Sequence, residues 1–249
     1  MKKLIAGNWK MHSTLTEAKE RIAGLAAFLQ SDQANHGAFD MLVCPPATML
    51  CPVQKWKDDA ILSVGGQDVH INEKGAHTGD ISAEMVADTS ATYALAGHSE
   101  RRADHGETSD IVRQKAEAAH RAGLIAVICV GEQESDRDAN QEYQVISAQL
   151  KQSIPAGATS ENTVIAYEPV WAIGTGKVAE ISDIEKMHAH IRNEIVGKVA
   201  QADQTRLLYG GSVKPTNAAD ILHTANVDGV LVGGASLLAE DFINIAKAA

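Results

Sequence analysis

Glu168 is the side chain best placed in this sequence to act as a base. It follows the apolar run Thr163–Tyr167, which has the composition of a buried strand, and Pro169 ends that strand because proline cannot donate to a sheet. A carboxylate at the carboxyl end of a buried parallel strand lies where α/β folds place catalytic groups. The apolar stretch 170–179 comes next, and we expect it to close over a ligand.

Three other polar groups stand at the ends of strand-like runs. Asn8 ends the run Leu4–Asn8 and Lys10 lies two residues further on, while His98 follows the run Tyr93–Ala96. An ammonium group can attract a phosphate and polarise a carbonyl, and an imidazole can donate an N–H to a developing oxyanion. A single lysine or histidine is more often a surface or core residue, but the shared position after a strand favours chemistry here. Asn8 is expected to hold Lys10 or to donate to a substrate oxygen.

Two glycine-rich turns follow the last two strand-like runs. They are Gly210-Gly211-Ser212 and Gly233-Gly234. Backbone N–H groups in such turns can form a row of donors for an anion, and the loops after the last two strands of a barrel are a common phosphate site. Either turn alone is more often a plain turn. The two together predict a phosphate site that includes Ser212, Gly233 and Gly234.

Short apolar runs alternate with amphipathic segments along the chain. This alternation predicts a parallel sheet with helices outside, and eight such units in 249 residues predict an α/β fold, a closed (β/α)8 TIM barrel forming a single domain over residues 1–249. An open doubly wound sheet is the alternative, although it usually has fewer strands and one glycine-rich turn. Capping boxes are expected at Thr14–Glu17 and Ser182–Glu185. The expected strands are Leu4–Asn8, Phe39–Cys44, Ile61–Gln67, Tyr93–Ala96, Leu124–Val130, Thr163–Tyr167, Arg206–Tyr209 and Gly229–Val232. The expected helices are Thr16–Gln30, Ser109–Arg121, Ala139–Gln152, Ser182–Lys198, Asn217–Thr224 and Glu240–Lys247.

The composition narrows the class of protein. A formal net charge of −10 argues against a general binder of nucleic acid or of acidic membranes. The three cysteines, Cys44, Cys51 and Cys129, lie far apart and show no disulfide or metal spacing. No run is long enough for a membrane span or a signal peptide, so we expect a cytoplasmic protein without a metal. His70 and His77 lie in a polar loop and are not expected to form a ligand cluster.

Five motifs, in order along the whole chain, resemble the triosephosphate isomerase family. They are Gly7–Met11, Ala96–Arg102, Ala166–Lys177, Tyr209–Val213 and Gly229–Ser236. The resemblance implies a barrel enzyme of glycolysis and gluconeogenesis that interconverts dihydroxyacetone phosphate and glyceraldehyde 3-phosphate without a cofactor. The family is itself the usual example of a loop that closes over an active site.

The resemblance also implies a role for each matching residue. Glu168 would move the proton between two carbons, His98 and Lys10 would stabilise the enediolate, and Asn8 would support them. Asn8 and Lys10 also match substrate contacts. The further positions that match phosphate contacts are Gly174, Ser212, Gly233 and Gly234. The positions that match supporting groups are Glu100, Cys129, Ile173 and Leu231, of which Ile173 and Leu231 would form an apolar clamp on Glu168.

The family is usually a homodimer, and its third loop, residues 65–80 here, reaches into the partner. Thr78 matches the family's intersubunit threonine. Asp68 stands where asparagine is common, and His77 stands where phenylalanine is common. These two departures leave the chemistry unchanged but bear on the packing of the interface and its dependence on pH.

Two other functions compete with the isomerase. A related isomerase of a four-carbon sugar phosphate, such as an erythrulose phosphate, would use the same base and phosphate groups in a roomier pocket. A non-catalytic barrel that only binds phosphorylated ligands would lack the base, the electrophile or the closing loop. All of these are present in the sequence, which favours an enzyme.

Overall fold

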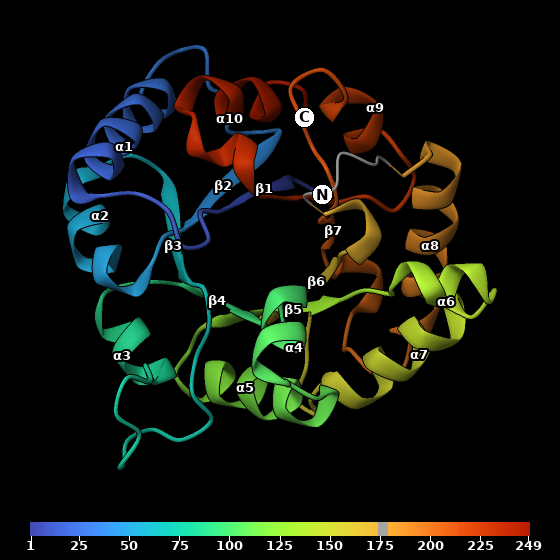
Figure 1. Cartoon of the computed structure of the whole chain (residues 1–249). Helices are drawn as coiled ribbons and strands as arrows, with labels where there is room; N and C mark the ends of the chain where they lie inside the picture. Colours follow the sequence, from blue (N-terminus) through green and yellow to red (C-terminus); the bar gives the residue numbers. More distant parts are fainter. Residues whose placement is uncertain (174–178) are drawn as a thin grey trace.

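A computed structural model describes residues 1–173 and 179–249, and its strands close into a parallel barrel (Figure 1). Neighbouring strands pair in chain order, and the last pairs with the first. The expected (β/α)8 barrel is therefore confirmed, and the open sheet is excluded. Each strand boundary lies within one residue of its expected position. The strands are β1 (Lys3–Asn8), β2 (Phe39–Cys44), β3 (Leu62–Gly66), β4 (Tyr93–Ala96), β5 (Ile125–Val130), β6 (Thr163–Tyr167), β7 (Leu207–Tyr209) and β8 (Gly229–Val232).

Helices surround the barrel on its outside (Figure 1). Within the described ranges, no helix is both long and apolar enough to cross a membrane. The α-helices are α1 (Leu15–Leu29), α2 (Leu50–Trp56), α3 (Ala83–Asp88), α4 (Ser99–His105), α5 (Ser109–Arg121), α6 (Glu134–Asp138), α7 (Glu142–Ser153), α8 (Ile181–Glu194), α9 (Ala218–Leu222) and α10 (Ala239–Ala246). The short 3₁₀ helices are η1 (Ala47–Met49), η2 (Val170–Ala172), η3 (Ala202–Gln204) and η4 (Gly234–Leu237).

The helices differ from the expected ones in their caps, ends and number, and α8 ends at Glu194 rather than at Lys198. The capping box of Thr14 and Glu17 is confirmed at α1, but the one expected at Ser182 is wrong. Helix α8 begins at Ile181 behind Glu180, whose extended backbone takes the N-cap position, so Ser182 lies inside the helix. The expected helix over 139–152 is preceded by a separate short helix, α6. Helices α2 and α3 were not expected, because six or seven residues are too few to establish a helical period.

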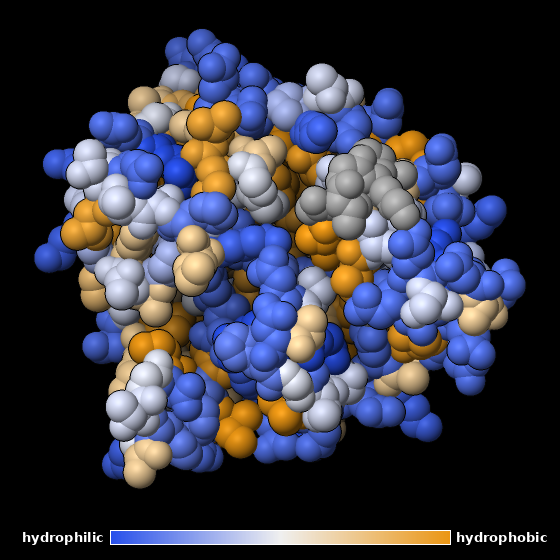
Figure 2. Space-filling view, in the orientation of Figure 1, coloured by the Kyte–Doolittle hydropathy of each residue, from blue (hydrophilic) through white to orange (hydrophobic). Residues whose placement is uncertain are grey.

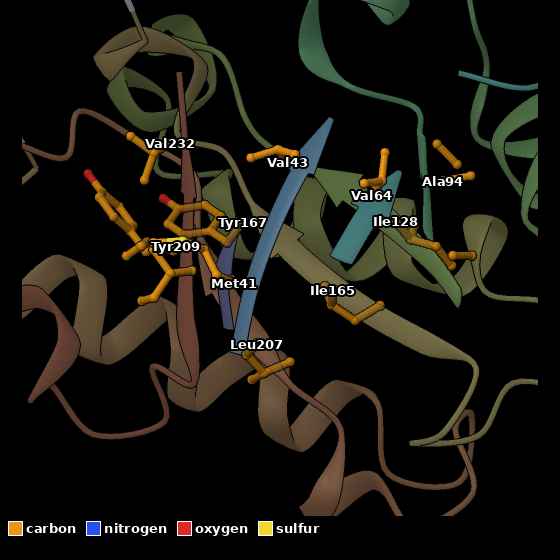
Figure 3. Close-up of a cluster of buried hydrophobic side chains, with 14 of the residues drawn as sticks. Met41, Val43, Val64, Ala94, Ile128, Ile165, Tyr167, Leu207, Tyr209 and Val232 are labelled. Atoms are coloured by element: carbon orange, nitrogen blue, oxygen red, sulfur yellow. The ribbon is translucent and has the colours of Figure 1, made fainter. Parts of the chain in front are cut away.

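The alternation of side chains along each strand positions the active-site carboxylate. In β6, Val164 and Ala166 belong to the core inside the barrel, whereas Ile165 and Tyr167 pack against the helices. Figure 3 shows Ile165 and Tyr167 in that outer core. Glu168 is the next inward-facing residue after Val164 and Ala166. Its side chain therefore lies at the mouth of the barrel.

Strand β1 repeats this arrangement. Leu4 and Ala6 belong to the inner core, and Asn8 follows them on the same side of the strand. Asn8 is paired with Cys44 at the end of β2, which fixes its height in the barrel. The period of two in each strand therefore brings groups from distant parts of the sequence to one mouth.

Candidate active site

A cavity of about 750 Å³ lies at the carboxyl ends of the strands. The same face is visibly hollowed in the space-filling view, and hydrophobic side chains lie in the wall of the hollow (Figure 2). Gly174, an expected phosphate contact, lies outside the described residues. The expected site residues that line the cavity are Asn8, Lys10, His98, Glu168, Ile173, Ser212, Leu231, Gly233 and Gly234.

Glu168 is a buried carboxylate with one unpaired oxygen. Its side chain is 2% exposed, and the backbone N–H of Ser99 donates to Oε2 at 2.9 Å. His98 Nε2 lies 3.3 Å from Oε1, yet Oε1 has no hydrogen-bond partner among the described residues. A buried polar atom without a partner is costly and is usually retained for function. Oε1 is therefore the atom that is free to accept a proton.

Two glycines allow neighbouring strands to pack tightly around Glu168. A Cβ atom at Gly131 would lie 1.8 Å from the carbonyl oxygen of Glu168, and one at Gly210 would lie 2.8 Å from its Cγ. The side-chain amide of Gln149 holds Gly131 on both sides, donating to its carbonyl at 2.8 Å and accepting from its N–H at 2.9 Å. This packing limits how far the base can move. The sequence reasoning missed Gly131 and Gln149, although a glycine directly after β5 was a visible signal.

His98 is oriented by the helix that it starts. It is the N-cap of α4, and the backbone N–H of Glu100 donates to its Nδ1 at 3.3 Å. Because Nδ1 accepts this bond, the proton of a neutral ring is assigned to Nε2, which lies 3.3 Å from Glu168 Oε1 without forming a hydrogen bond to it. The imidazole can thus donate an N–H into the cavity.

Lys10 is held in an uncommon backbone conformation. Its φ angle is 52°, in the left-handed region, where a residue other than glycine is strained unless its surroundings fix it. The Lys10 N–H donates to Asn8 Oδ1 at 2.9 Å, and Gln67 Nε2 donates to the Lys10 carbonyl at 2.8 Å. Asn8 therefore holds Lys10, as expected, and Gln67 is a second support that sequence reasoning missed.

The ammonium group of Lys10 is paired with a carboxylate at the edge of the cavity. Nζ donates to Oε1 of Glu100 at 2.5 Å. Burial raises the pKa of Glu100, but the hydrogen bond and charge of Lys10 outweigh it and hold that pKa below its ordinary value. An anionic ligand must therefore compete with Glu100 for Lys10, which is 26% exposed.

The glycine-rich turns form the other side of the cavity. The 3₁₀ helix η4 begins directly after Gly233, so the N–H groups of Gly234 and Ala235 have no earlier helical residue to which they could donate, whereas the N–H of Ser236 donates to the Gly233 carbonyl at 2.9 Å. A Cβ atom at Gly233 would lie 3.5 Å from Cε of Lys10, and one at Gly211 would collide with the hydroxyl of Tyr209 at 2.2 Å. Backbone donors and an ammonium group therefore lie together, which suits an anion such as a phosphate.

Glu132 anchors the segment that follows the base. Its carboxylate is fully buried, and Oε1 accepts from Trp171 Nε1 at 2.9 Å, from the Tyr167 hydroxyl at 3.0 Å and from Arg137 Nη1 at 3.3 Å. Burial raises the pKa of Glu132 even though these donors oppose the shift. The backbone is tied as well, since the N–H of Val170 donates to the Glu132 carbonyl at 3.1 Å. Sequence reasoning missed Glu132, because two of its three partners, Tyr167 and Trp171, lie 35 and 39 residues further along the chain.

Cys129 lies beside the base but is not a nucleophile. It is fully buried, and burial together with the charge of Glu168 raises its pKa well above the ordinary value. The thiol therefore stays protonated and serves as an apolar neighbour.

The described ranges contain one group of three side chains suited to hold a metal ion, and it lies outside this cavity. It consists of His70, His77 and Asp80 in the loop between β3 and α3. The fold thus brings His70 and His77 close together with Asp80, a proximity that the sequence reasoning did not expect. The loop folds back on itself and brings together residues that their spacing in the sequence did not connect.

The chain is similar to known proteins along almost its whole length. The family model described as Triosephosphate isomerase matches residues 3–249. Triosephosphate isomerase of Rhizobium meliloti (strain 1021) is 50% identical over 246 residues, which cover 98% of this chain and 95% of that relative. The relative of the same name from Afipia carboxidovorans is 52% identical over 246 residues, with 98% and 96% covered. A crystal structure of triosephosphate isomerase from Bartonella henselae at 1.6 Å matches with a TM-score of 0.91 and 42% identity, covering 100% of this chain and 99% of that one.

Proposed function

The chain belongs to the triosephosphate isomerase family, and from this premise we infer that it interconverts dihydroxyacetone phosphate and D-glyceraldehyde 3-phosphate. It is an intramolecular aldose–ketose isomerase that acts in glycolysis and gluconeogenesis, and we assign the reaction to one barrel domain that needs no cofactor. The comparisons do not support the alternative of a four-carbon sugar phosphate isomerase.

Glu168 is the base in this proposal. Its carboxylate removes a proton from C1 of dihydroxyacetone phosphate, the C–H electron pair forms the C1–C2 double bond, and the carbonyl oxygen on C2 takes up the negative charge. Protonation of C2 by the same carboxyl group then gives the aldehyde. The supporting observation is the buried Oε1 that has no hydrogen-bond partner among the described residues, 3.3 Å from His98. A proton acceptor must be within reach and unoccupied, and this oxygen is both.

His98 and Lys10 stabilise the enediolate. The N–H assigned to His98 Nε2 can donate to an oxygen on C1 or C2, and it can assist the proton transfer between these oxygens that the isomerisation requires. Lys10 supplies a positive charge on the other side of the cavity, held in place by Asn8 and Gln67. Donors fixed before the reaction stabilise developing charge without reorganisation, and that is the main electrostatic source of catalysis.

The phosphate binds at the glycine-rich turns. We assign its contacts to Ser212, Gly233 and Gly234 together with Lys10, and Gly174 belongs to the same set by its match to the family. Ile173 and Leu231 line the cavity beside Glu168 and exclude water from the base. Glu100 and Cys129 support the site without contacting substrate. A ligand held by its phosphate keeps its reacting carbons within reach of Glu168. The binding energy of the phosphate contacts thereby orients the substrate for the reaction.

A coupled assay of the aldose–ketose conversion tests the proposal. Wild-type protein should turn over both triose phosphates, whereas Glu168→Ala should lose most activity while keeping its melting temperature. Glu20→Ala, at an exposed position on α1, serves as the matched control. Near-normal turnover by Glu168→Ala would contradict the assignment of the base, and no turnover by wild type would favour a barrel that only binds phosphorylated ligands.

We also propose a homodimer that forms through the loop of residues 65–80. This loop projects away from the barrel in Figure 1, and Thr78 lies on it in an exposed position. A second cavity, of about 510 Å³, lies beside the loop and is lined by Met11 and Lys10 among others. Met11 is 95% exposed and lines this cavity, so the loop of a partner that entered the cavity would cover it.

Sedimentation velocity distinguishes a dimer from a monomer. Wild type is expected to sediment as a dimer, and Met11→Asp together with Thr78→Arg should shift the protein to a monomer of lower activity, because Lys10 lies next to the covered surface. A wild-type monomer with full activity would exclude the homodimer. For the location of the protein, we propose the cytoplasm.

A further inference from the structure

The guanidinium group of Arg102 joins the carboxyl ends of two neighbouring barrel strands. Arg102 lies on α4, and its Nε donates to the carbonyl of Gly97, directly after β4, at 2.9 Å. Its Nη2 donates to the carbonyl of Cys129, near the end of β5, at 3.0 Å. The hydroxyls of Ser109 and Ser153 accept from the same group at 3.1 and 3.4 Å. One side chain therefore fixes the ends of β4 and β5 relative to each other.

Each of these strand ends leads to a residue of the candidate active site. The end of β4 leads directly to His98, and the backbone N–H of Arg102 donates to the His98 carbonyl at 3.1 Å. The end of β5 leads to Val130, whose carbonyl accepts from the backbone N–H of Glu168 at 2.8 Å. Short paths of hydrogen bonds and backbone therefore connect Arg102 both to the imidazole and to the carboxylate.

Arg102 also brings a positive charge close to Glu168. Both side chains lie in the wall of a smaller cavity, of about 350 Å³. Within the part of the chain that the structure describes, no carboxylate forms an ion pair with Arg102, and the acceptors of its guanidinium are carbonyls and hydroxyls. Burial lowers the pKa of Arg102, although the negative charge of Glu168 is among those that oppose this shift. A cation in this position stabilises the ionised carboxylate by Coulomb attraction.

We propose that Arg102 is a positioning residue of the isomerisation, which holds His98 and Glu168 in place across β4 and β5 and stabilises the negative charge of Glu168 from behind the site. The role depends on the proposed isomerase function, because it concerns the base of that reaction. A carboxylate that loses a nearby cation takes up a proton more readily, and a protonated carboxyl group cannot act as a base. A second residue that fixes the base and the donor in advance also limits the loss of their geometry.

Other titratable groups also surround Glu168, and they stay in place when Arg102 is replaced. Glu107 faces Arg102 but is paired with Arg101 and Lys115, so its charge is already offset. A change in the pH profile on replacement of Arg102 therefore reports the charge of Arg102 itself. The groups that line the two cavities with Glu168, or lie beside it, are Lys10, His12, His98, Lys214 and Asp241 in the 750 Å³ cavity, Glu107 and Asp136 in the 350 Å³ cavity, and the thiol of Cys129.

Steady-state kinetics of the full chain and of two variants, measured across the acidic and neutral pH range, test the proposal. Arg102→Gln should lower kcat near neutral pH by roughly tenfold or more. Its KM for the triose phosphates should change by less than about threefold, because the phosphate contacts lie on the other side of the cavity. The fall of its kcat on the acidic side should begin about half a pH unit or more above that of wild type.

Arg102→Lys keeps the charge but not the geometry. Its kcat should fall on the acidic side at the same pH as that of wild type. Near neutral pH its kcat should lie between those of wild type and Arg102→Gln, about three- to tenfold below wild type, because one ammonium group cannot reproduce the planar fork that reaches both strand ends.

Arg192→Gln is the matched control for a purely structural arginine. Arg192 donates to the carbonyls of Ala202 and Thr205 and pairs with Asp228, near the starts of β7 and β8 and thus at the opposite end of the barrel from the cavity. Its replacement should lower the melting temperature, but the acidic fall of kcat should stay at the wild-type pH.

The outcomes separate this inference from the proposed function. A folded Arg102→Gln variant with the wild-type pH profile and kcat would overturn the inference alone. If Arg102→Gln does not fold, Arg102→Lys decides, because a wild-type kcat in that variant, or a shift of its acidic fall to higher pH, would equally overturn it. A wild type that does not interconvert the triose phosphates would overturn the proposed function and this inference with it.

Discussion

Glu168 and Asp68 are both carboxylates that follow a barrel strand, but they differ in their hydrogen-bond and charge partners. Asp68 accepts from Lys115 Nζ at 2.6 and 2.7 Å and pairs with Arg101 Nε at 3.0 Å. Glu168 has no lysine or arginine partner within the described residues, and its Oε1 accepts no hydrogen bond from them although His98 Nε2 lies 3.3 Å away. Burial and position after a strand are therefore not enough to identify a reactive group. Glu107 and Glu132 also have an oxygen without a hydrogen-bond partner, but both carboxylates pair with a lysine or an arginine. What distinguishes Glu168 is the combination of such an oxygen, no lysine or arginine partner within the described residues, and a position in the wall of the 750 Å³ cavity.

The ions around Asp68 form a closed structural cluster. Lys115 also donates to Glu107 at 2.6 Å, and Arg101 Nε donates to the same oxygen at 2.5 Å. Burial raises the pKa of Asp68 despite its two cations, whereas in Glu107 the hydrogen bonds of Lys115 and Arg101 outweigh burial and lower the pKa. Such a cluster gives little net stability relative to apolar packing, but removing one member leaves the others uncompensated.

The same chemical change at both carboxylates gives the sharpest test of this difference. Glu168→Gln should lower kcat by roughly 10²- to 10⁴-fold, because an amide cannot accept the proton. Asp68→Asn should leave kcat within about twofold, because no oxygen of Asp68 serves the reaction. Steady-state kinetics of both variants, with melting temperatures to verify folding, provide the comparison. Equal losses of activity would show that the two carboxylates are not functionally distinct.

The same replacement of the two lysines should separate stability from catalysis. Lys115→Met should reduce the free energy of unfolding by about 3–5 kcal/mol, because Asp68 and Glu107 would lose their buried cation and share only the half-buried Arg101. Activity per folded molecule should be retained. Urea unfolding monitored by circular dichroism at a fixed protein concentration measures the effect. An unchanged urea midpoint would mean that water stabilises the charges of Asp68 and Glu107 as well as Lys115 does.

Lys10→Met is expected to have the opposite effect to Lys115→Met, with a large loss of activity and little loss of stability. Its exposed pair with Glu100 should contribute at most about 1 kcal/mol to stability. Its loss should lower kcat/KM by about 10²- to 10³-fold, since a positive charge directed at the developing oxyanion is removed. Kinetics on both triose phosphates with thermal melts would detect both effects. A large loss of stability with little loss of activity would assign Lys10 to structure instead.

The sequence predicts those features of the two regions that depend only on the pattern of a short segment. The end of each apolar run located Asn8, His98 and Glu168, because a period of two residues and a helix start are properties of short segments. The strands were placed within one residue for the same reason. Helices α2 and α3 were missed because a helix of two turns or fewer takes its stability from the barrel against which it packs.

The contacts that support the site depend on folding and could not be predicted. Gln67 reaches Lys10, Gln149 bonds to both sides of Gly131, and Glu132 accepts from Tyr167 and Trp171, yet each is an ordinary polar residue in its own stretch of sequence. The partnership of Asp68 with Lys115 spans two βα units and leaves no local signal. Roles that arise from tertiary contact become visible only when the partners are brought together.

Asp68→Asn should also change how the free energy of unfolding depends on pH, and this is the smallest of the expected effects. Burial raises the pKa of Asp68 in the folded protein above the ordinary value of 3.8, so between these two values the folded state binds more protons than the unfolded state. Stability from this group is therefore greatest below pH 3.8 and falls as the pH rises through the folded pKa. Asp68→Asn does not lose this stability as the pH rises. Between pH 4 and pH 7, its free energy of unfolding should therefore increase relative to that of the wild type by about 1 kcal/mol or less. Urea midpoints across that range, at one protein concentration, measure the gap. A gap that shrinks with rising pH would show that attraction to Lys115 and Arg101 exceeds the cost of burial, and Asp68 would then be a stabilising member of its cluster.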